Sequence, residues 1–197
     1  MRPRERHGPP HEVRIIGGTL RRSKLPVADL PGLRPTPDRV RETLFNWLGQ
    51  DLTGWRCIDA YAGSGALGFE AASRGAASVL LLERDPRLVR SLRASRERLG
   101  AGAVSVEPAD ALAWLRRAAP ASADLVFIDP PFEANQFDAA LAAAAPVVVP
   151  GGYVYLEADR PFDDAAVAAH GLRVHRQARA GAVHFHLLQR LPGPDAA

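Results

Sequence analysis

From residue 56 onward, short apolar segments alternate with helical patterns, and this alternation limits the possible folds more than any other feature. The segments are continuously apolar, which indicates strands buried on both faces of a parallel sheet with helices on each side. Segments 172–178 and 182–190 are separated by too few residues for a crossover, so we expect them to pair antiparallel. The sequence therefore predicts an α/β fold with a doubly wound, mostly parallel, seven-stranded sheet. The other predicted strands are 56–59, 78–83, 104–107, 125–129 and 153–157, and the predicted helices are 66–74, 86–99, 111–118 and 137–145.

The residues before this alternation form a separate extension. Segment 13–27 has two β-prone arms around glycine and arginine, which is typical of a hairpin. Thr36 is a good N-cap and Pro37 a good first residue for a helix that ends near Gly49. We divide the chain into a basic leader (1–12), an N-terminal hairpin and helix (13–49), a main domain (50–190) and a tail (191–197).

Charge and composition restrict the class of protein. Hydrophobic residues make up 47% and charged residues 24%, the balance of an ordinary globular chain. The longest apolar run is too short to span a membrane, and the first residues lack a secretory signal. We expect a soluble cytoplasmic monomer. Residues 1–41 carry ten Lys and Arg against four Asp and Glu, which favours a polyanionic partner, although a leader kept for solubility explains it equally well.

A glycine-rich loop, DAYAGSGALG at residues 59–68, follows the first strand of the main domain. Gly63, Gly65 and Gly68 allow a tight turn and a close approach to a ligand, and the helix that follows favours negative charge at its start. This pattern suits either the pyrophosphate of a dinucleotide or the carboxylate end of S-adenosylmethionine.

Three acidic residues favour S-adenosylmethionine. Asp59, just before the glycines, would repel a pyrophosphate but suits a sulfonium or an ammonium group. Glu83 ends the second strand, where it can accept hydrogen bonds from ribose hydroxyls, and Asp110 follows the third, where it can accept from the adenine amine. Each alone could be only a helix cap, but all three are expected on one crevice.

The segment DPPF, residues 129–132, closes the fourth strand beside this crevice. Asp129 and the Pro130 carbonyl can converge as hydrogen-bond acceptors, because the two prolines, Pro130 and Pro131, fix the backbone and donate nothing. Phe132 offers a face on which a flipped base can stack. Two acceptors and a stacking plate suit the exocyclic amine of a base, whose lone pair they would aim at a methyl group.

The chain resembles the bacterial small-subunit (16S) ribosomal RNA guanine-N2 methyltransferases, which have the Rossmann-like class I methyltransferase fold. The resemblance rests on IIGG (15–18), LRPT (33–36), DRVRETLFNW (38–47), the glycine loop, SRG (73–75), DPPF and YVYLE (153–157). It implies an enzyme that uses S-adenosylmethionine and acts on the assembled 30S subunit.

The resemblance also implies roles for particular residues. The implied catalytic residues are Asp129, Pro130, Pro131 and Phe132. The cofactor set is Asp59, Tyr61, Gly63, Ser64, Gly65, Gly68, Glu83, Arg84, Asp110 and Ala111. The N-terminal hairpin is expected to grip RNA, and the RNA-binding set is Arg14, Arg21, Arg22, Lys24, Arg34, Thr36 and Arg39.

Other activities fit the sequence less well. Cys57, the one cysteine, lies inside a strand as a small core residue, so the cysteine nucleophile of a pyrimidine-C5 methyltransferase is not expected. His184 and His186 share one strand face, which we interpret as an exposed sheet surface, and no metal is expected. The open alternatives are an adenine-N6 nucleic-acid methyltransferase and a non-catalytic RNA-binding assembly factor on the same fold.

Overall fold

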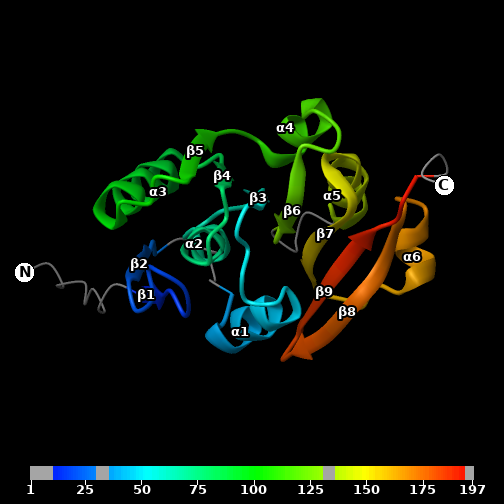
Figure 1. Ribbon diagram of the computed structural model, residues 1–197, viewed down its shortest axis with the longest axis horizontal. Coiled ribbons are helices and arrows are strands. Elements are labelled where there is room, and N and C mark those ends of the chain that lie inside the picture. The colour runs from blue at the N-terminus through cyan, green and yellow to red at the C-terminus, as the bar shows by residue number, and fades with distance from the viewer. Residues whose placement is uncertain (1–10, 30–35, 131–135, 194–197) are drawn as a thin grey trace, which may run out of the picture.

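The computed structural model describes residues 11–29, 36–130 and 136–193 (Figure 1). A small antiparallel pair, β1–β2, stands beside a seven-stranded sheet of order β5-β4-β3-β6-β7-β9-β8. The strands are β1 (His11–Arg14), β2 (Lys24–Val27), β3 (Arg56–Asp59), β4 (Ser78–Glu83), β5 (Val104–Pro108), β6 (Ala123–Ile128), β7 (Val148–Ala158), β8 (Leu172–Ala180) and β9 (Val183–Arg190). The helices are α1 (Asp38–Trp47), α2 (Ala66–Ser73), α3 (Pro86–Leu99), α4 (Ala111–Arg117), α5 (Phe137–Ala144), the short 3-10 turn η2 (Ala145–Val147) and α6 (Asp164–Ala168).

The sheet confirms the predicted architecture. Strands β3 to β7 pair in parallel, whereas β9 pairs antiparallel with both β7 and β8. From β3 the chain moves outward to β4 and β5, then returns to place β6 on the other side of β3. The carboxyl ends of β3 and β6 therefore flank the point where the strand order reverses, which is where open α/β sheets bind ligands.

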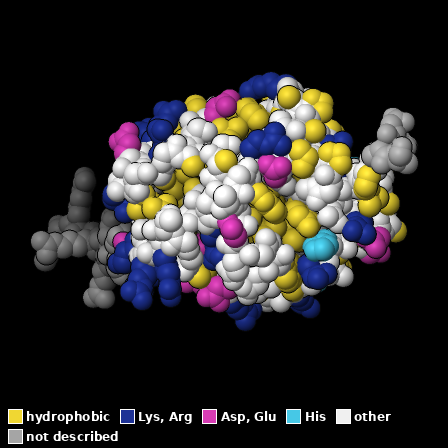
Figure 2. Space-filling view, viewed as in Figure 1, with side chains coloured by type: hydrophobic (Ala, Val, Ile, Leu, Met, Phe, Trp, Pro, Cys, Tyr) yellow, Lys and Arg dark blue, Asp and Glu magenta, His cyan; other side chains and the backbone are white. Residues whose placement is uncertain are grey.

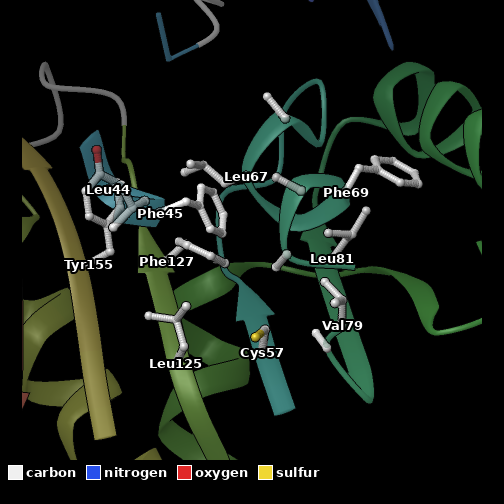
Figure 3. Close-up of a cluster of buried hydrophobic side chains, with 14 of the residues drawn as sticks. Leu44, Phe45, Cys57, Leu67, Phe69, Val79, Leu81, Leu125, Phe127 and Tyr155 are labelled. Carbon is white, nitrogen blue, oxygen red and sulfur yellow. The ribbon is translucent and has the colours of Figure 1, made fainter. Parts of the chain in front are cut away.

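Helices bury both faces of the sheet. The hairpin and helices α1, α2 and α3 pack on one face, and α4, α5 and α6 pack on the other. On the first face, Phe45 of α1 lies against Phe127 of β6 with 6.3 Å between the ring centroids, and Phe127 meets Tyr155 of β7 edge-on (Figure 3). Cys57 lies in the same core and is 2% exposed, as predicted.

Local sequence signals explain α3. Its first turn is capped by the side chain of Asp85, which accepts a hydrogen bond from the Arg87 N–H at 2.8 Å, and Pro86 occupies the first helical position. Gly100 ends the helix with a φ of +59°, the left-handed conformation that glycine adopts without strain. Among the described residues, no helix is both long and apolar enough to cross a membrane.

Two predictions about local structure are wrong. The Thr36 side chain does not cap α1, which begins at Asp38 after Pro37, because the Thr36 hydroxyl instead donates to Glu157. His186 is not exposed: it is 1% exposed, and its Nε2 accepts a hydrogen bond from the Phe162 N–H at 3.0 Å. In both cases the side chain of Thr36 or His186 forms a hydrogen bond with a residue that is distant in the sequence.

Candidate functional site

Five acidic side chains gather at the carboxyl edge of the parallel strands. Three lie at or just after the ends of β3, β4 and β5, and two lie at the ends of the neighbouring strands β6 and β7. Because these strands are adjacent and parallel, their carboxyl ends meet along one edge of the sheet. The residues are Asp59, Glu83, Asp110, Asp129 and Glu157.

The glycine loop joins this edge to α2. Gly63 and Gly65 have φ angles of +53° and +79°, so the turn uses the left-handed conformation that glycine supplies. Glu83 fastens the loop, because its Oε2 accepts from the Gly63 N–H at 3.0 Å while its Oε1 accepts from the Asp85 N–H at 2.8 Å. Glu83 thereby fixes the loop at the start of α2.

Asp59 lies beneath this loop. It is 2% exposed, and its Oδ2 accepts a hydrogen bond from the Gly68 N–H at 3.0 Å. A Cβ at position 68 would lie 2.2 Å from the Leu81 side chain, so any other residue there would have to displace that buried side chain. Burial, with a smaller contribution from the charges of Glu83 and Glu157, raises the pKa of Asp59 to about 7. A nearby cation would favour its charged form.

Asp110 and Tyr61 lie close enough at this edge of the sheet for the charge of Asp110 to act on the Tyr61 hydroxyl. The Oδ1 of Asp110 caps α4 by accepting from the Ala113 N–H at 2.9 Å. The hydroxyl of Tyr61 is buried and has no hydrogen-bond partner in the described parts of the chain. Burial first, and then the charge of Asp110, raise the pKa of Tyr61 to about 12, while Arg84 opposes this shift. An unpartnered buried hydroxyl is costly, so a polar ligand group that bonds to the Tyr61 hydroxyl would be stabilising.

Asp129 directly follows β6, next to the glycine loop. Pro130 is buried beside it, while Pro131 and Phe132 lie outside the described residues. Burial raises the pKa of Asp129 well above its usual value, and the charges of Glu157 and Asp59 raise it further. The predicted acceptor and the predicted cofactor loop thus meet at the strand-order reversal, although the stacking role of Phe132 stays a prediction.

Glu157 is a site residue that motif reasoning left without a role. It is 4% exposed, and its Oε1 accepts hydrogen bonds from the Thr36 hydroxyl at 2.7 Å and the Tyr155 hydroxyl at 2.8 Å. The available signal was an acidic residue at the end of an otherwise apolar strand. Thr36, predicted to contact RNA, is 5% exposed and already holds this carboxylate, so the structure gives its hydroxyl a different partner.

A buried ion cluster fastens the N-terminal extension to α2. Glu70, fully buried in α2, accepts from the Ile16 and Gly17 N–H groups, each at 2.8 Å, and pairs with Arg41 at 3.3 Å and Arg74 at 2.9 Å. Asp38 also pairs with Arg41, at 2.6 Å, so two carboxylates oppose the two guanidinium groups, as buried ions require. The sequence did not reveal Arg41 as a buried residue, because its partner lies in another helix.

The hairpin loop also covers the C-terminal end of α2. The Thr19 N–H donates to the Ser73 carbonyl at 2.7 Å, and the Leu20 N–H donates to the Ser73 hydroxyl at 2.8 Å. Gly18 has a φ of +74°, and a Cβ there would lie 1.8 Å from the Ser73 carbonyl oxygen. The glycine pair of the IIGG segment therefore lets the hairpin dock closely on this helix.

Basic side chains of the predicted RNA-binding set are exposed around the docked hairpin. Figure 2 shows Lys and Arg gathered at the hairpin end of the molecule. An open hollow of about 580 Å³ lies between the hairpin loop and α1, with Arg21 and Arg74 among its walls. Arg34 lies outside the described residues. The exposed members of the set are Arg14, Arg21, Arg22, Lys24 and Arg39, of which Lys24 pairs with Glu12 at 2.7 Å.

Comparison with known proteins assigns the family. The sequence matches the family described as Conserved hypothetical protein 95 over residues 13–189. The chain belongs to this family. "Ribosomal RNA small subunit methyltransferase D" of Escherichia coli (strain K12) is 39% identical over 186 residues, 93% of each chain. The Haemophilus influenzae protein of the same name is 36% identical over 185 residues, covering 90% of this chain and 94% of the relative.

A solved structure supports the same assignment. The structure described as "Putative methyltransferase yhhF from Escherichia coli" matches with a TM-score of 0.79 at 36% identity, covering 92% of this chain and 99% of that chain. The resemblance expected from the motifs is confirmed, and this member of the family is a methyltransferase with the expected fold.

Proposed function

We propose that this protein transfers a methyl group from S-adenosylmethionine to the exocyclic N2 of a guanine in 16S ribosomal RNA, on the assembled 30S subunit in the cytoplasm. The observation that carries the proposal is the position of Asp129 and Pro130, at the carboxyl end of the strand next to the glycine loop. The names of the relatives, small-subunit ribosomal RNA methyltransferases, support the choice of RNA.

The residues present fit S-adenosylmethionine. The open lone pairs of Glu83 would accept from the ribose hydroxyls, and the unpartnered Tyr61 hydroxyl lies where Asp110 and Arg84 would meet the adenosine end. The remaining members of the cofactor set would follow the loop and the start of α4, namely Gly63, Ser64, Gly65, Gly68 and Ala111. Asp59, beneath the loop, would face the positively charged amino-acid end. When bound, the cofactor supplies a methyl group activated on a sulfonium.

Asp129 and Pro130 would prepare the acceptor amine. The nitrogen lone pair of an exocyclic amine is delocalised into the ring, which makes the amine a poor nucleophile. Hydrogen bonds from its two N–H groups to the Asp129 carboxylate and the Pro130 carbonyl favour a pyramidal nitrogen and fix its direction. The carboxylate also stabilises the positive charge that grows on nitrogen. Because the pKa of Asp129 is raised, it can take the proton that the nitrogen must lose.

Substitution of Asp129 tests this role. We expect Asp129→Asn and Asp129→Ala each to lower kcat by at least about 100-fold, the contribution typical of an acid–base or electrostatic group. Cofactor affinity, measured by calorimetric titration, should stay within about threefold, since the glycine loop is intact. Asp124→Asn is the matched control, because Asp124 lies on the same strand and pairs with Arg56 at its opposite end. Equal losses of turnover and cofactor affinity in the Asp129 variants would contradict the assignment.

The exposed basic side chains of the hairpin would bind the RNA backbone, together with Arg34 and Arg39. Neutralising Arg21, Arg22 and Lys24 should weaken RNA binding and reduce its salt dependence by up to about three phosphate contacts. A control variant with the same charge change replaces three exposed arginines of α3, Arg90, Arg93 and Arg96. An equal effect of both triple variants would show that only net charge matters.

Mass spectrometry of ribosomal nucleosides tests the product. Removal of the gene should abolish one N2-methylguanosine of the small-subunit RNA, and purified enzyme should restore it on 30S subunits more efficiently than on naked RNA. Loss of N6-methyladenosine instead would replace guanine by adenine as the target. Unchanged nucleosides, together with no binding of S-adenosylmethionine, would favour the non-catalytic assembly factor.

A further inference from the structure

Hydrogen bonds from an exocyclic amine to Asp129 and the Pro130 carbonyl do not by themselves distinguish guanine from adenine. Both bases carry an exocyclic amine that could donate to Asp129 and to the Pro130 carbonyl. They differ at the ring position next to that amine: guanine presents an N1–H donor beside N2, and adenine presents an N1 lone pair beside N6. A site that chooses guanine therefore needs a hydrogen-bond acceptor adjacent to the one that holds the amine.

The sheet places such an acceptor next to Asp129. Strands β6 and β7 are parallel and in register, with Phe127 opposite Tyr155 and Ile128 opposite Leu156. Asp129 directly follows Ile128 at the end of β6, and Glu157 directly follows Leu156 in β7. Side chains alternate along a strand, so both carboxylates project from the face that carries Phe127 and Tyr155, about 5 Å apart at the backbone. The charge of Glu157 accordingly raises the pKa of Asp129.

Only one of the two carboxylate oxygens of Glu157 accepts hydrogen bonds from the described residues. The Thr36 and Tyr155 hydroxyls both donate to Oε1, and within the described residues Oε2 accepts no hydrogen bond. Thr36 is itself fixed, because its carbonyl accepts from the buried Arg41 Nε at 3.2 Å. The carboxylate is therefore oriented from the side of α1, with a second oxygen left to accept from another donor.

We propose that Glu157 is a specificity-determining residue whose Oε2 accepts the N1–H of the target guanine while Asp129 holds its N2 amine. The inference rests on the proposed function and deepens it. Adenine in the same place would turn its N1 lone pair toward the Glu157 carboxylate, with repulsion and no hydrogen bond. A buried acceptor left unpaired by the wrong base discriminates far more strongly than a difference in shape.

The test compares two bases at the methylated position. 2-Aminopurine keeps the amine at N2 but has a lone pair in place of the N1–H. Wild-type enzyme should show a kcat/KM at least about 100-fold lower for RNA carrying 2-aminopurine than for RNA carrying guanine, as expected for an acceptor left unpaired. A ratio near one for the wild-type enzyme would overturn the proposal without reference to any variant.

The Glu157→Gln variant then assigns the effect to this residue. Its amide oxygen can still accept from Thr36 and Tyr155, while its NH₂ group replaces Oε2 and can donate to the 2-aminopurine N1. We expect the guanine to 2-aminopurine ratio to fall by at least about tenfold relative to the wild type. Because 2-aminopurine also lacks O6, the comparison between enzymes cancels any contact made to O6.

The controls separate this inference from folding and from the proposed function. Asp124→Asn, at the opposite end of β6, removes the pair with Arg56 and should leave the base ratio of the wild type intact. Calorimetric binding of S-adenosylmethionine checks that each variant is folded. An unchanged ratio in Glu157→Gln, with N2-methylguanosine still the product, refutes the role of Glu157 alone. A wild-type product other than N2-methylguanosine refutes the proposed function, and this inference with it.

Discussion

Replacing Asp59 by Asn should remove a large pH-dependent contribution to the unfolding free energy of the cofactor-free protein. Burial beneath the glycine loop raises the pKa of Asp59 from 3.8 to about 7. At about 1.4 kcal/mol per pKa unit, this difference corresponds to about 4 kcal/mol. Asn keeps an oxygen that can accept from the Gly68 N–H, so the variant removes the charge and retains the contact.

The sign follows from which state holds the proton. Below about pH 4, Asp59 is protonated in both the folded and the unfolded chain, so its stabilising contribution is fully present. Between about pH 4 and pH 7, the unfolded chain ionises first, and the free energy of unfolding falls as pH rises. The wild type should therefore lose about 4 kcal/mol more than Asp59→Asn across this range.

Urea unfolding of both proteins at pH values from 4.5 to 8, followed by circular dichroism, measures this difference. Asp129 and Glu157 have raised pKa values as well, and the charge of Asp59 adds to the shift of Asp129. The difference between the two proteins therefore reports Asp59 together with its coupling to these carboxyl groups. A difference that stays constant over the whole pH range would refute the argument that the Asp59 carboxyl is buried without a compensating charge.

Three further predictions concern the fold around the site. Glu70→Gln should lower the free energy of unfolding by about 3–5 kcal/mol in urea titrations, because it removes the carboxylate that pairs with Arg74 and leaves the buried Arg41 with only the exposed Asp38. Gly18→Ala should place a methyl group against Ser73, so amide exchange in the hairpin should accelerate, whereas the control Gly181→Ala has open space and should not affect it. Burial raises the pKa of the Cys57 thiol to about 12, so a thiol reagent at pH 8 should react with it only as the protein unfolds.

Local signals in the sequence predicted the main domain well. The bounds of β3, β4 and α3 were predicted to the residue. The signals that define these elements, namely apolar runs and the caps Asp85 and Gly100, lie in or directly beside the elements themselves. The positions of the glycine loop and of Asp129 at the strand-order reversal were likewise predicted. Helix α6 was missed, since Asp164–Ala168 is too short to show helical periodicity.

The features that sequence reasoning missed depend on distant partners. Thr36 and Glu157 are 121 residues apart, and their hydrogen bond converts a predicted helix cap into a support for a buried carboxylate. Nothing near Arg41 in the sequence indicates that it is buried, because its partner Glu70 lies in another helix. His186 was assigned to an exposed face because nothing near it in the sequence indicates that it accepts a hydrogen bond from the Phe162 N–H. Tertiary contacts decided each case.

The docking of the hairpin on α2 makes that helix a spacer of fixed length. The glycine loop precedes the helix, and the hairpin rests on its last residue, Ser73, so the two lie at opposite ends of an eight-residue helix. One residue inserted in α2 would move the hairpin contact at Ser73 about 1.5 Å along the helix axis and rotate it by about 100° relative to the glycine loop. If the hairpin binds RNA as proposed, the RNA strand would reach the carboxyl edge of the sheet at one distance and one angle, and the length of a single short helix would set both.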